Sequence, residues 1–149
     1  MSAPASGAAH LVERLIADHR RIEESACLIY EECARGDCVV ALLALAALHL
    51  EMERHDGVEE NALFPLLGRK LPDLEERLAH VRRQHRVAEH VRCQLERTLL
   101  AGDDVAAVQG ADELYALLVG NHTTEELVIY GVIDELLAHL HGEDSASRS

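Results

Sequence analysis

The sequence predicts an all-α protein, an antiparallel four-helix bundle whose helices run up, down, up and down. Apolar residues recur at steps of 3 and 4 in four long segments, as Val12, Leu15, Ile22 and Ile29 do in the first, and this is the period of one helix face. Short breaks containing Gly, Pro or Asp separate the segments. Because short connections favour antiparallel neighbours, the four helices are expected to pack as a bundle.

The breaks give the bounds of each helix. Gly36 and Asp37 end the first helix, the stretch from Pro65 to Pro72 closes the second, and residues 101–104 precede the fourth. An Asp stands at the capping position before the second and the fourth helix, where its side chain can accept a backbone N–H. The predicted helices span residues 8–35, 38–65, 72–100 and 104–141. They form one bundle of residues 8–141, and residues 1–7 and 142–149 are predicted to be flexible tails.

Composition fits a single domain with one core and limits the partners. The chain has 149 residues, of which 48% are hydrophobic, enough for a full core. It carries 14 basic and 27 acidic residues, a net charge of -13, which argues against nucleic acid or an anionic membrane as a partner. The four cysteines form no C-x-x-C pair, so a zinc knuckle or a disulfide framework is not expected. Without a signal-peptide pattern or a membrane-length apolar run, the chain is predicted to be cytoplasmic.

Polar residues occupy inward positions of these helices, where a bundle normally has apolar side chains. His19 falls between Leu15 and Ile22 in the first stripe, and the other three stripes are interrupted in the same way. A buried imidazole or carboxylate costs several kcal/mol unless it is compensated, and bound metal compensates both groups. The candidate metal ligands are therefore His19, His55, Glu59, His85, His122 and Glu126; no catalytic residue can be assigned.

An internal repeat indicates two metal positions. His19 and His85 are 66 residues apart, while His55 and His122 are 67 apart. Each half supplies one His and then a His-x-x-x-Glu pair, so the two glutamates can bridge two equivalent metals. Imidazole and carboxylate without thiolate suit iron, manganese or zinc, and a carboxylate-bridged pair with open positions suits redox-active iron or manganese best. Such a centre leaves room for a small ligand: peroxide, dioxygen or nitric oxide.

The ligand motifs resemble those of the hemerythrin-like, or HHE cation-binding, domain family over nearly the whole chain. The segment from His55 to Pro65 resembles the family's H-x-x-x-E-E-x-x-L-F-P helix, and residues 122–126 resemble its fourth-helix motif. Asp18-His19 and Gln84-His85 match the sites on the first and third helices. The resemblance implies a four-helix bundle holding a non-haem diiron site, two iron ions with an oxo or hydroxo bridge, so that manganese or zinc is less expected. Family members use such sites to carry oxygen, to sense iron, oxygen or redox state, or to handle peroxide and nitric oxide.

One departure from the family's oxygen carriers bears on function. The carriers have H-x-x-x-H on the third helix and H-x-x-x-x-D on the fourth, whereas this chain has His85 with Glu89 and His122 with Glu126. The order H, HxxxE, H, HxxxE resembles a subgroup linked to iron sensing or to peroxide decomposition. We therefore expect a diiron protein that binds and decomposes peroxide, of catalase or peroxidase type. The alternative is a module that senses or binds iron, oxygen or nitric oxide without turnover and signals by a change in fold stability, for which a protein partner could provide the output.

Two further residues have an open role. Glu89 lies one helical turn after His85 and can supply an extra ligand or an acceptor for it. Tyr130 lies two turns after His122 and can reach the metals as a hydrogen-bond donor, redox partner or ligand, although bundle packing is the simpler reading. The remaining histidines are expected on the surface: His10, His49, His80, His90, His139 and His141.

Overall fold

The computed structural model describes the backbone of residues 3–146 and the side chains of residue 7 and residues 10–139. Met1, Ser2 and residues 147–149 belong to the predicted flexible ends and lie outside the described residues. Residues 3–7 and 142–146, the rest of those predicted ends, are helical. The first and last helices are therefore longer than the sequence pattern indicated.

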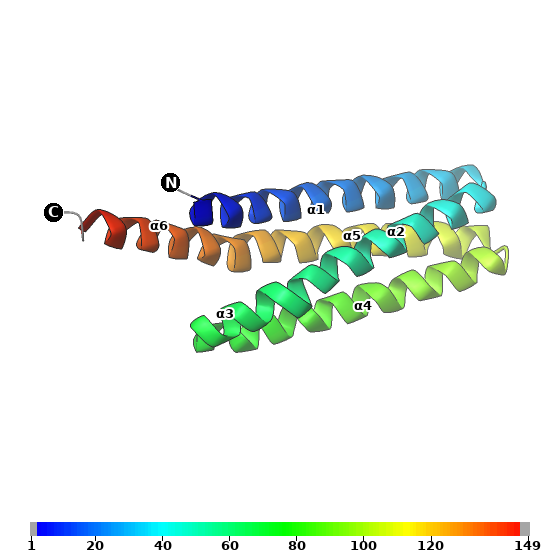
Figure 1. The fold of residues 1–149 in the computed structure, drawn as a ribbon. Coiled ribbons are helices and arrows are strands. Elements are labelled where there is room, and N and C mark those ends of the chain that lie inside the picture. The colour runs from blue at the N-terminus through cyan, green and yellow to red at the C-terminus, as the bar shows by residue number, and fades with distance from the viewer. Residues whose placement is uncertain (1–2, 147–149) are drawn as a thin grey trace.

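The described part of the chain is an antiparallel four-helix bundle, as predicted (Figure 1). Its four rods lie side by side, and both termini lie at one end (Figure 1). The first rod packs against the second and the fourth, and the third packs against the fourth and the second. The first rod is α1 (Ala3–Arg35). The second consists of α2 (Cys38–Val58), the π-helical turn η1 (Glu59–Leu63) and α3 (Phe64–Lys70). The third is the 3-10 turn η2 (Pro72–Leu74) with α4 (Glu75–Leu100), and the fourth joins α5 (Asp104–Thr124), the π-helical turn η3 (Glu125–Tyr130) and α6 (Gly131–Ala146).

Two equivalent turns connect the rods at the end of the bundle opposite the termini. Gly36 and Gly102 have positive φ angles of 77° and 72°, which glycine adopts without strain where a helix ends. The next residues are the helix caps: Asp37 accepts a hydrogen bond from the Val40 backbone N–H, and Asp103 accepts one from Ala106. The predicted capping positions are thus both confirmed.

The second rod continues past Pro65, where the sequence suggested an end. The Phe64 N–H donates to the carbonyl of Glu59, five residues earlier, as the last bond of the π turn. Pro65, which has no N–H to donate, directly follows this bond. The proline therefore fits in the helical rod, which ends at Lys70 instead.

Two apolar cores lie along the bundle, and the predicted ligand residues lie between them. The core toward the glycine turns includes Ile29, Leu45, Leu95 and Leu114. The core toward the termini includes Phe64, Leu78, Ile129 and Tyr130. Within residues 3–146, no helix combines the length and the apolarity that a membrane crossing requires.

The capping bond gives a first testable prediction. Asp103→Ala removes the acceptor for an otherwise unpaired N–H at the start of α5 and should lower the free energy of unfolding by about 1 kcal/mol. Urea denaturation followed by circular dichroism measures this. The control is Asp112→Ala, at an exposed position within the same helix, which should change stability by less than about 0.5 kcal/mol. Equal losses in the two variants would show that the cap contributes nothing.

Candidate metal centre

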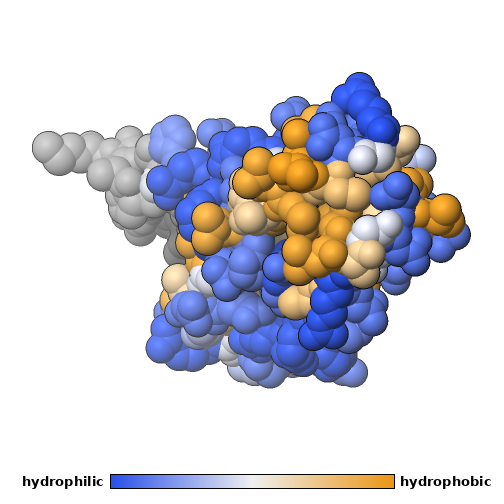
Figure 2. All heavy atoms as spheres, turned by 90° about the vertical axis from the view of Figure 1, so that its right-hand side faces the viewer, coloured by the Kyte–Doolittle hydropathy of each residue, from blue (hydrophilic) through white to orange (hydrophobic). Residues whose placement is uncertain are grey.

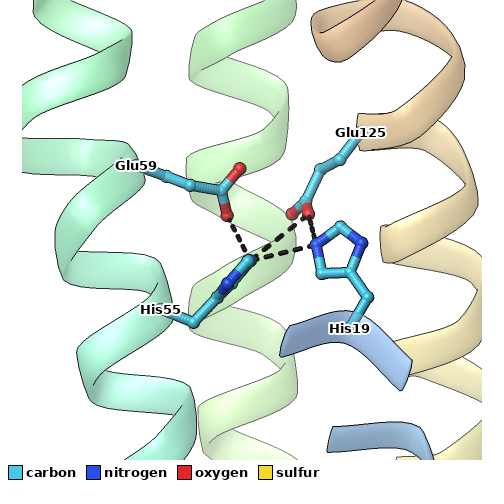
Figure 3. Close-up of side chains that lie close together, drawn as sticks. All are labelled: His19, His55, Glu59 and Glu125. Atoms are coloured by element: carbon cyan, nitrogen blue, oxygen red, sulfur yellow. Dashed lines mark hydrogen bonds and ion pairs between the residues drawn. The ribbon is translucent and has the colours of Figure 1, made fainter. Parts of the chain in front are cut away.

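Side chains from four elements converge between the two cores (Figure 3). His19 comes from α1, His55 from α2, Glu59 from η1 and Glu125 from η3; all four are buried, and one ligand atom of each lies within 4.8 Å of the others. His19 Nε2 is 3.0 Å from His55 Nε2 and 2.8 Å from a Glu125 oxygen, and His55 Nε2 is 2.9 Å from a Glu59 oxygen. Ligand atoms about 2.1 Å from one ion and at right angles to each other are about 3.0 Å apart, so these spacings fit a metal site.

Two carboxylate oxygens in this layer lie close to histidine nitrogens without a well-aligned hydrogen bond. Among the described side chains, Glu59 Oε1 and Glu125 Oε2 are buried and have no hydrogen-bond partner, although each lies within 3 Å of a histidine Nε2. A buried carboxylate oxygen without a hydrogen bond costs free energy. A cation between these oxygens and the Nε2 atoms would satisfy the lone pairs of both, so the residues fit a bound metal.

A second cluster adjoins the first and shares Glu59 with it. Asp56, Glu59 and His85 form another group able to hold a cation. Glu125 also connects the two clusters, because its Oε2 faces His19 while its Oε1 lies 2.8 Å from His85 Nε2. The arrangement therefore provides two adjacent clusters joined by Glu59, which belongs to both, and by Glu125, which contacts a histidine of each.

Each of the four histidines has a carboxylate at its Nδ1 atom. An ionised carboxylate at this position accepts the Nδ1 proton and orients the ring, as in carboxylate–histidine–metal arrangements. In three of the four histidines, the Nε2 atom then faces the shared glutamates or a neighbouring imidazole. The Nδ1 to oxygen distances are 3.3 Å for His19 with Glu126, 3.3 Å for His55 with Asp18, 2.8 Å for His85 with Glu60 and 2.9 Å for His122 with Glu23.

Glu125, and not the predicted ligand Glu126, belongs to the cluster of convergent ligand atoms. Glu125 is 1% exposed, whereas the Glu126 side chain is 19% exposed and contacts Arg20 and His19 Nδ1. At about 100° per residue, the two glutamates lie about 50° to either side of the apolar stripe of the fourth rod, so spacing alone does not choose between them. The π turn η3 begins at Glu125, as η1 begins at Glu59. Each inward glutamate is thus the first residue of a π turn, a feature frequent at functional sites.

His122 and Tyr130 extend the layer around His19. The His122 ring stacks on His19 with centroids 3.8 Å apart, but His122 is in neither cluster of convergent ligand atoms. The Tyr130 hydroxyl donates to Glu59 at 3.1 Å and lies 3.3 Å from His19 Nε2. Of the residues with an open role, Tyr130 therefore touches the site, whereas Glu89 pairs with Arg92. His80 and His90 are exposed, as expected.

Sequence reasoning missed the inward roles of Glu125 and Asp56 and the contact of Glu23 with His122. Glu23 lies one helical turn after His19, and Asp56 follows His55 directly. Their positions next to ligands were visible in the sequence. Only the three-dimensional register of α1 against the fourth rod brings Glu23 to His122.

Burial and charge set opposite protonation states for two of the histidines. Burial lowers the pKa of His85, but the contact with Glu125 and the charges of Asp56 and Glu59 outweigh it and raise that pKa to about 10. Burial and the neighbouring His19 lower the pKa of His122 to about 4. Burial also raises the pKa of Asp56, to about 7, while contacts with His19 and His85 hold the pKa of Glu125 below its usual value despite burial. Without metal, the layer is a proton-sharing network.

A cavity gives solvent access to one side of the layer. It has a volume of about 380 Å³, lies between α2 and α4, and reaches His85 and Asp56. Its other polar lining residues are Glu53, Glu60, Arg86 and Glu89. The carboxylates of Glu53, Glu60 and Glu89 outnumber the charges of Arg86 and the protonated His85, so this entrance favours cations and neutral molecules over anions.

These features define a helical-bundle protein with histidine and glutamate side chains that could hold cations between its two cores. The family model of the hemerythrin HHE cation-binding domain matches residues 10–146. The chain belongs to this family. No curated protein and no solved structure matched the chain.

The protonation of His85 predicts how metal affinity depends on pH. With a pKa of about 10, His85 is protonated at neutral pH and must release a proton to ligate. Metal affinity should therefore fall as pH falls, by about tenfold per pH unit for each proton released. Chelator competition between about pH 6 and 9 measures the slope, and calorimetry in two buffers counts the protons.

The matched control is His85→Asn, which cannot hold the competing proton and should bind metal more weakly with a shallower pH slope. His122, whose pKa is about 4, contributes no proton at neutral pH. A flat affinity in the unmodified protein with no proton release would contradict this account.

Proposed function

We propose that the protein is a non-haem diiron protein whose buried centre binds and decomposes peroxide. The observation that carries the proposal is the pair of adjacent ligand clusters that have Glu59 in common, with Glu125 in contact with a histidine of each. Shared carboxylates hold two cations a few ångströms apart, the arrangement used in two-metal catalysis.

The proposed ligands divide into two groups around the shared glutamates. His19 and His55 would hold one ion, and His85 with Asp56 the other. Of the six ligands expected from the sequence, Glu126 is proposed to orient His19 instead of bridging, because both of its oxygens contact other residues. His122 stacks against His19 and would complete the first position by a small ring movement.

Ligand type supports iron. The convergent atoms are imidazole nitrogens and carboxylate oxygens, and no cysteine sulfur belongs to either cluster of the described residues. Such a donor set suits iron or manganese with open positions better than structural zinc. Iron held in both positions would supply the redox chemistry: the reduced pair would give two electrons to one peroxide, which becomes water, and the oxidised pair would take two electrons from a second peroxide, which becomes dioxygen, or from an added reductant.

The surroundings of the clusters support a small neutral ligand. The entrance cavity of about 380 Å³ ends at His85 and has an acidic lining, which disfavours anions but not hydrogen peroxide. Asp56, with a pKa of about 7, lies at this entrance and can accept or return a proton near neutral pH. The Tyr130 hydroxyl donates to Glu59 and limits the space at the opposite side.

A second function, iron or gas sensing without turnover, is favoured by the burial of the ligands. His19, His55, Glu59 and Glu125 are each at most 1% exposed, so metal loading must strongly affect the stability of the bundle. A protein partner could recognise the change. Peroxide turnover distinguishes the two functions.

The first prediction of this proposal concerns stoichiometry and the roles of the two glutamates. The reconstituted protein should hold about two iron ions per chain. Glu125→Ala should lose iron from both positions, whereas Glu126→Ala should keep two ions with an affinity lowered about 10- to 100-fold, as for the loss of a group that orients a ligand. Metal analysis after gel filtration measures both. Full iron in Glu125→Ala, or complete loss only in Glu126→Ala, would reverse the assignment.

The second prediction concerns turnover. Hydrogen peroxide added to the iron-loaded protein should release dioxygen, or be consumed when a reductant is supplied, at a rate proportional to bound iron. Glu125→Ala should abolish the reaction, and His80→Ala, at an exposed position outside both clusters, should keep it. An oxygen electrode measures the rate. A protein with two bound ions and no turnover would support the sensing function.

A further inference from the structure

The first half of α2 is apolar on nearly all sides, yet one side faces solvent. Residues 38–50 contain no Asp, Glu, Lys or Arg, and their one histidine, His49, lies in the groove toward α4. Ala41, Leu45 and Leu48 are buried in the core, whereas Val39, Leu43 and Leu50 are 69%, 67% and 66% exposed. A helix that is hydrophobic nearly all round is normally covered all round, so this side lacks a partner within the described part of the chain.

The exposed residues form a regular stripe. Val39, Leu43, Ala46 and Leu50 are all exposed and follow one another at steps of 4, 3 and 4, the spacing of the contact seam between two packed helices. We refer to these four residues as the outer face of α2. Figure 2 looks onto the end of the bundle where α2 begins and shows apolar side chains gathered among hydrophilic ones.

Neighbouring apolar surface widens the outer face on both sides. A groove of about 400 Å³ between α2 and α4 runs beside it and is lined by Leu42, Leu45 and Leu50, with Arg92 and Glu96 at its polar wall. At the start of α2, the Cys38 thiol donates to Asp104 at 3.2 Å. The adjacent Val105, 72% exposed, therefore extends the apolar surface onto α5.

We propose that the outer face of α2 binds a second copy of this chain, as a two-fold symmetric dimer with the two α2 helices antiparallel. An axis through the middle of the stripe places Val39 of one copy against Leu50 of the other, and Leu43 against Ala46. Large residues thereby face small or medium ones, and the same patch serves both copies. Because each chain carries a net charge of -13, an uncharged face is where two copies approach with least repulsion.

The size of the face sets the expected affinity. A stripe of 12 residues is about 18 Å long, and a stable interface buries about 800 Å² per partner. The stripe supplies part of this area, and the apolar residues of the flanking groove add to the contact beside it. We therefore expect a reversible dimer with a Kd in the micromolar range.

Sedimentation velocity of the metal-loaded full chain between about 1 and 200 µM tests the proposal. The unmodified protein should shift from 16.4 kDa to twice that mass as concentration rises. Leu43→Arg should remain monomeric. Val87→Arg, at a 52% exposed position about 140° around α4 from the groove residue Arg92, should dimerise like the unmodified protein. Helix content and bound metal should match in all three, which shows that the fold is retained.

A charge-pair test addresses the antiparallel register and stands independently if Leu43→Arg does not fold. Val39→Arg and Leu50→Glu should each prevent dimerisation, and the double variant should restore it, because each introduced arginine then faces an introduced glutamate across the axis. These positions are too far apart along one helix to pair within a chain. A monomeric unmodified protein at every concentration, or a double variant that stays monomeric, would overturn the proposal.

Discussion

The burial of imidazole and carboxylate groups between two apolar cores is the constraint on which the rest of the structure depends. Each unpaired charge in such a place costs several kcal/mol, and Glu59 and Glu125 have essentially no exposure. Carboxylates at the four Nδ1 atoms hold the rings, and the contacts of Glu125 with His19 and His85 offset part of the remaining cost. One oxygen of each glutamate still lacks a well-aligned hydrogen bond, so part of the cost of burying these carboxylates is not offset by the protein, and a bound cation would offset it.

The π turns allow the helical rods to continue without a break through the polar layer. Each begins at an inward glutamate and is followed by residues that return to the core, as Leu63 and Phe64 do after Glu59. The wider turn adds a residue without breaking the rod, so a carboxylate and the apolar residues beyond it can face the same interior. The same geometry accommodates Pro65 within the second rod. The same local distortion, a π turn that begins at a buried glutamate, therefore occurs in both halves of the chain.

Much of the fold could be predicted from the sequence, because 3–4 periodicity, glycine breaks and aspartate caps are local signals. The helix ends near Gly36 and Gly102 agree with the structure for this reason. His19, His55, Glu59 and His85 interrupt apolar stripes, so their inward position was visible too. The choice between Glu125 and Glu126 was not, since both lie beside the stripe and the π turn decides. Glu23 and His122 meet only through the packing of two distant helices, which no local pattern contains.

Anomalous diffraction at the iron edge from crystals of the iron-loaded protein tests the central claim most directly. The account predicts two iron peaks a few ångströms apart between the apolar cores, with Glu59 and Glu125 each contacting both and with Glu126 on His19 Nδ1. A single peak, or a pair bridged by Glu126 while Glu125 points to solvent, would contradict it.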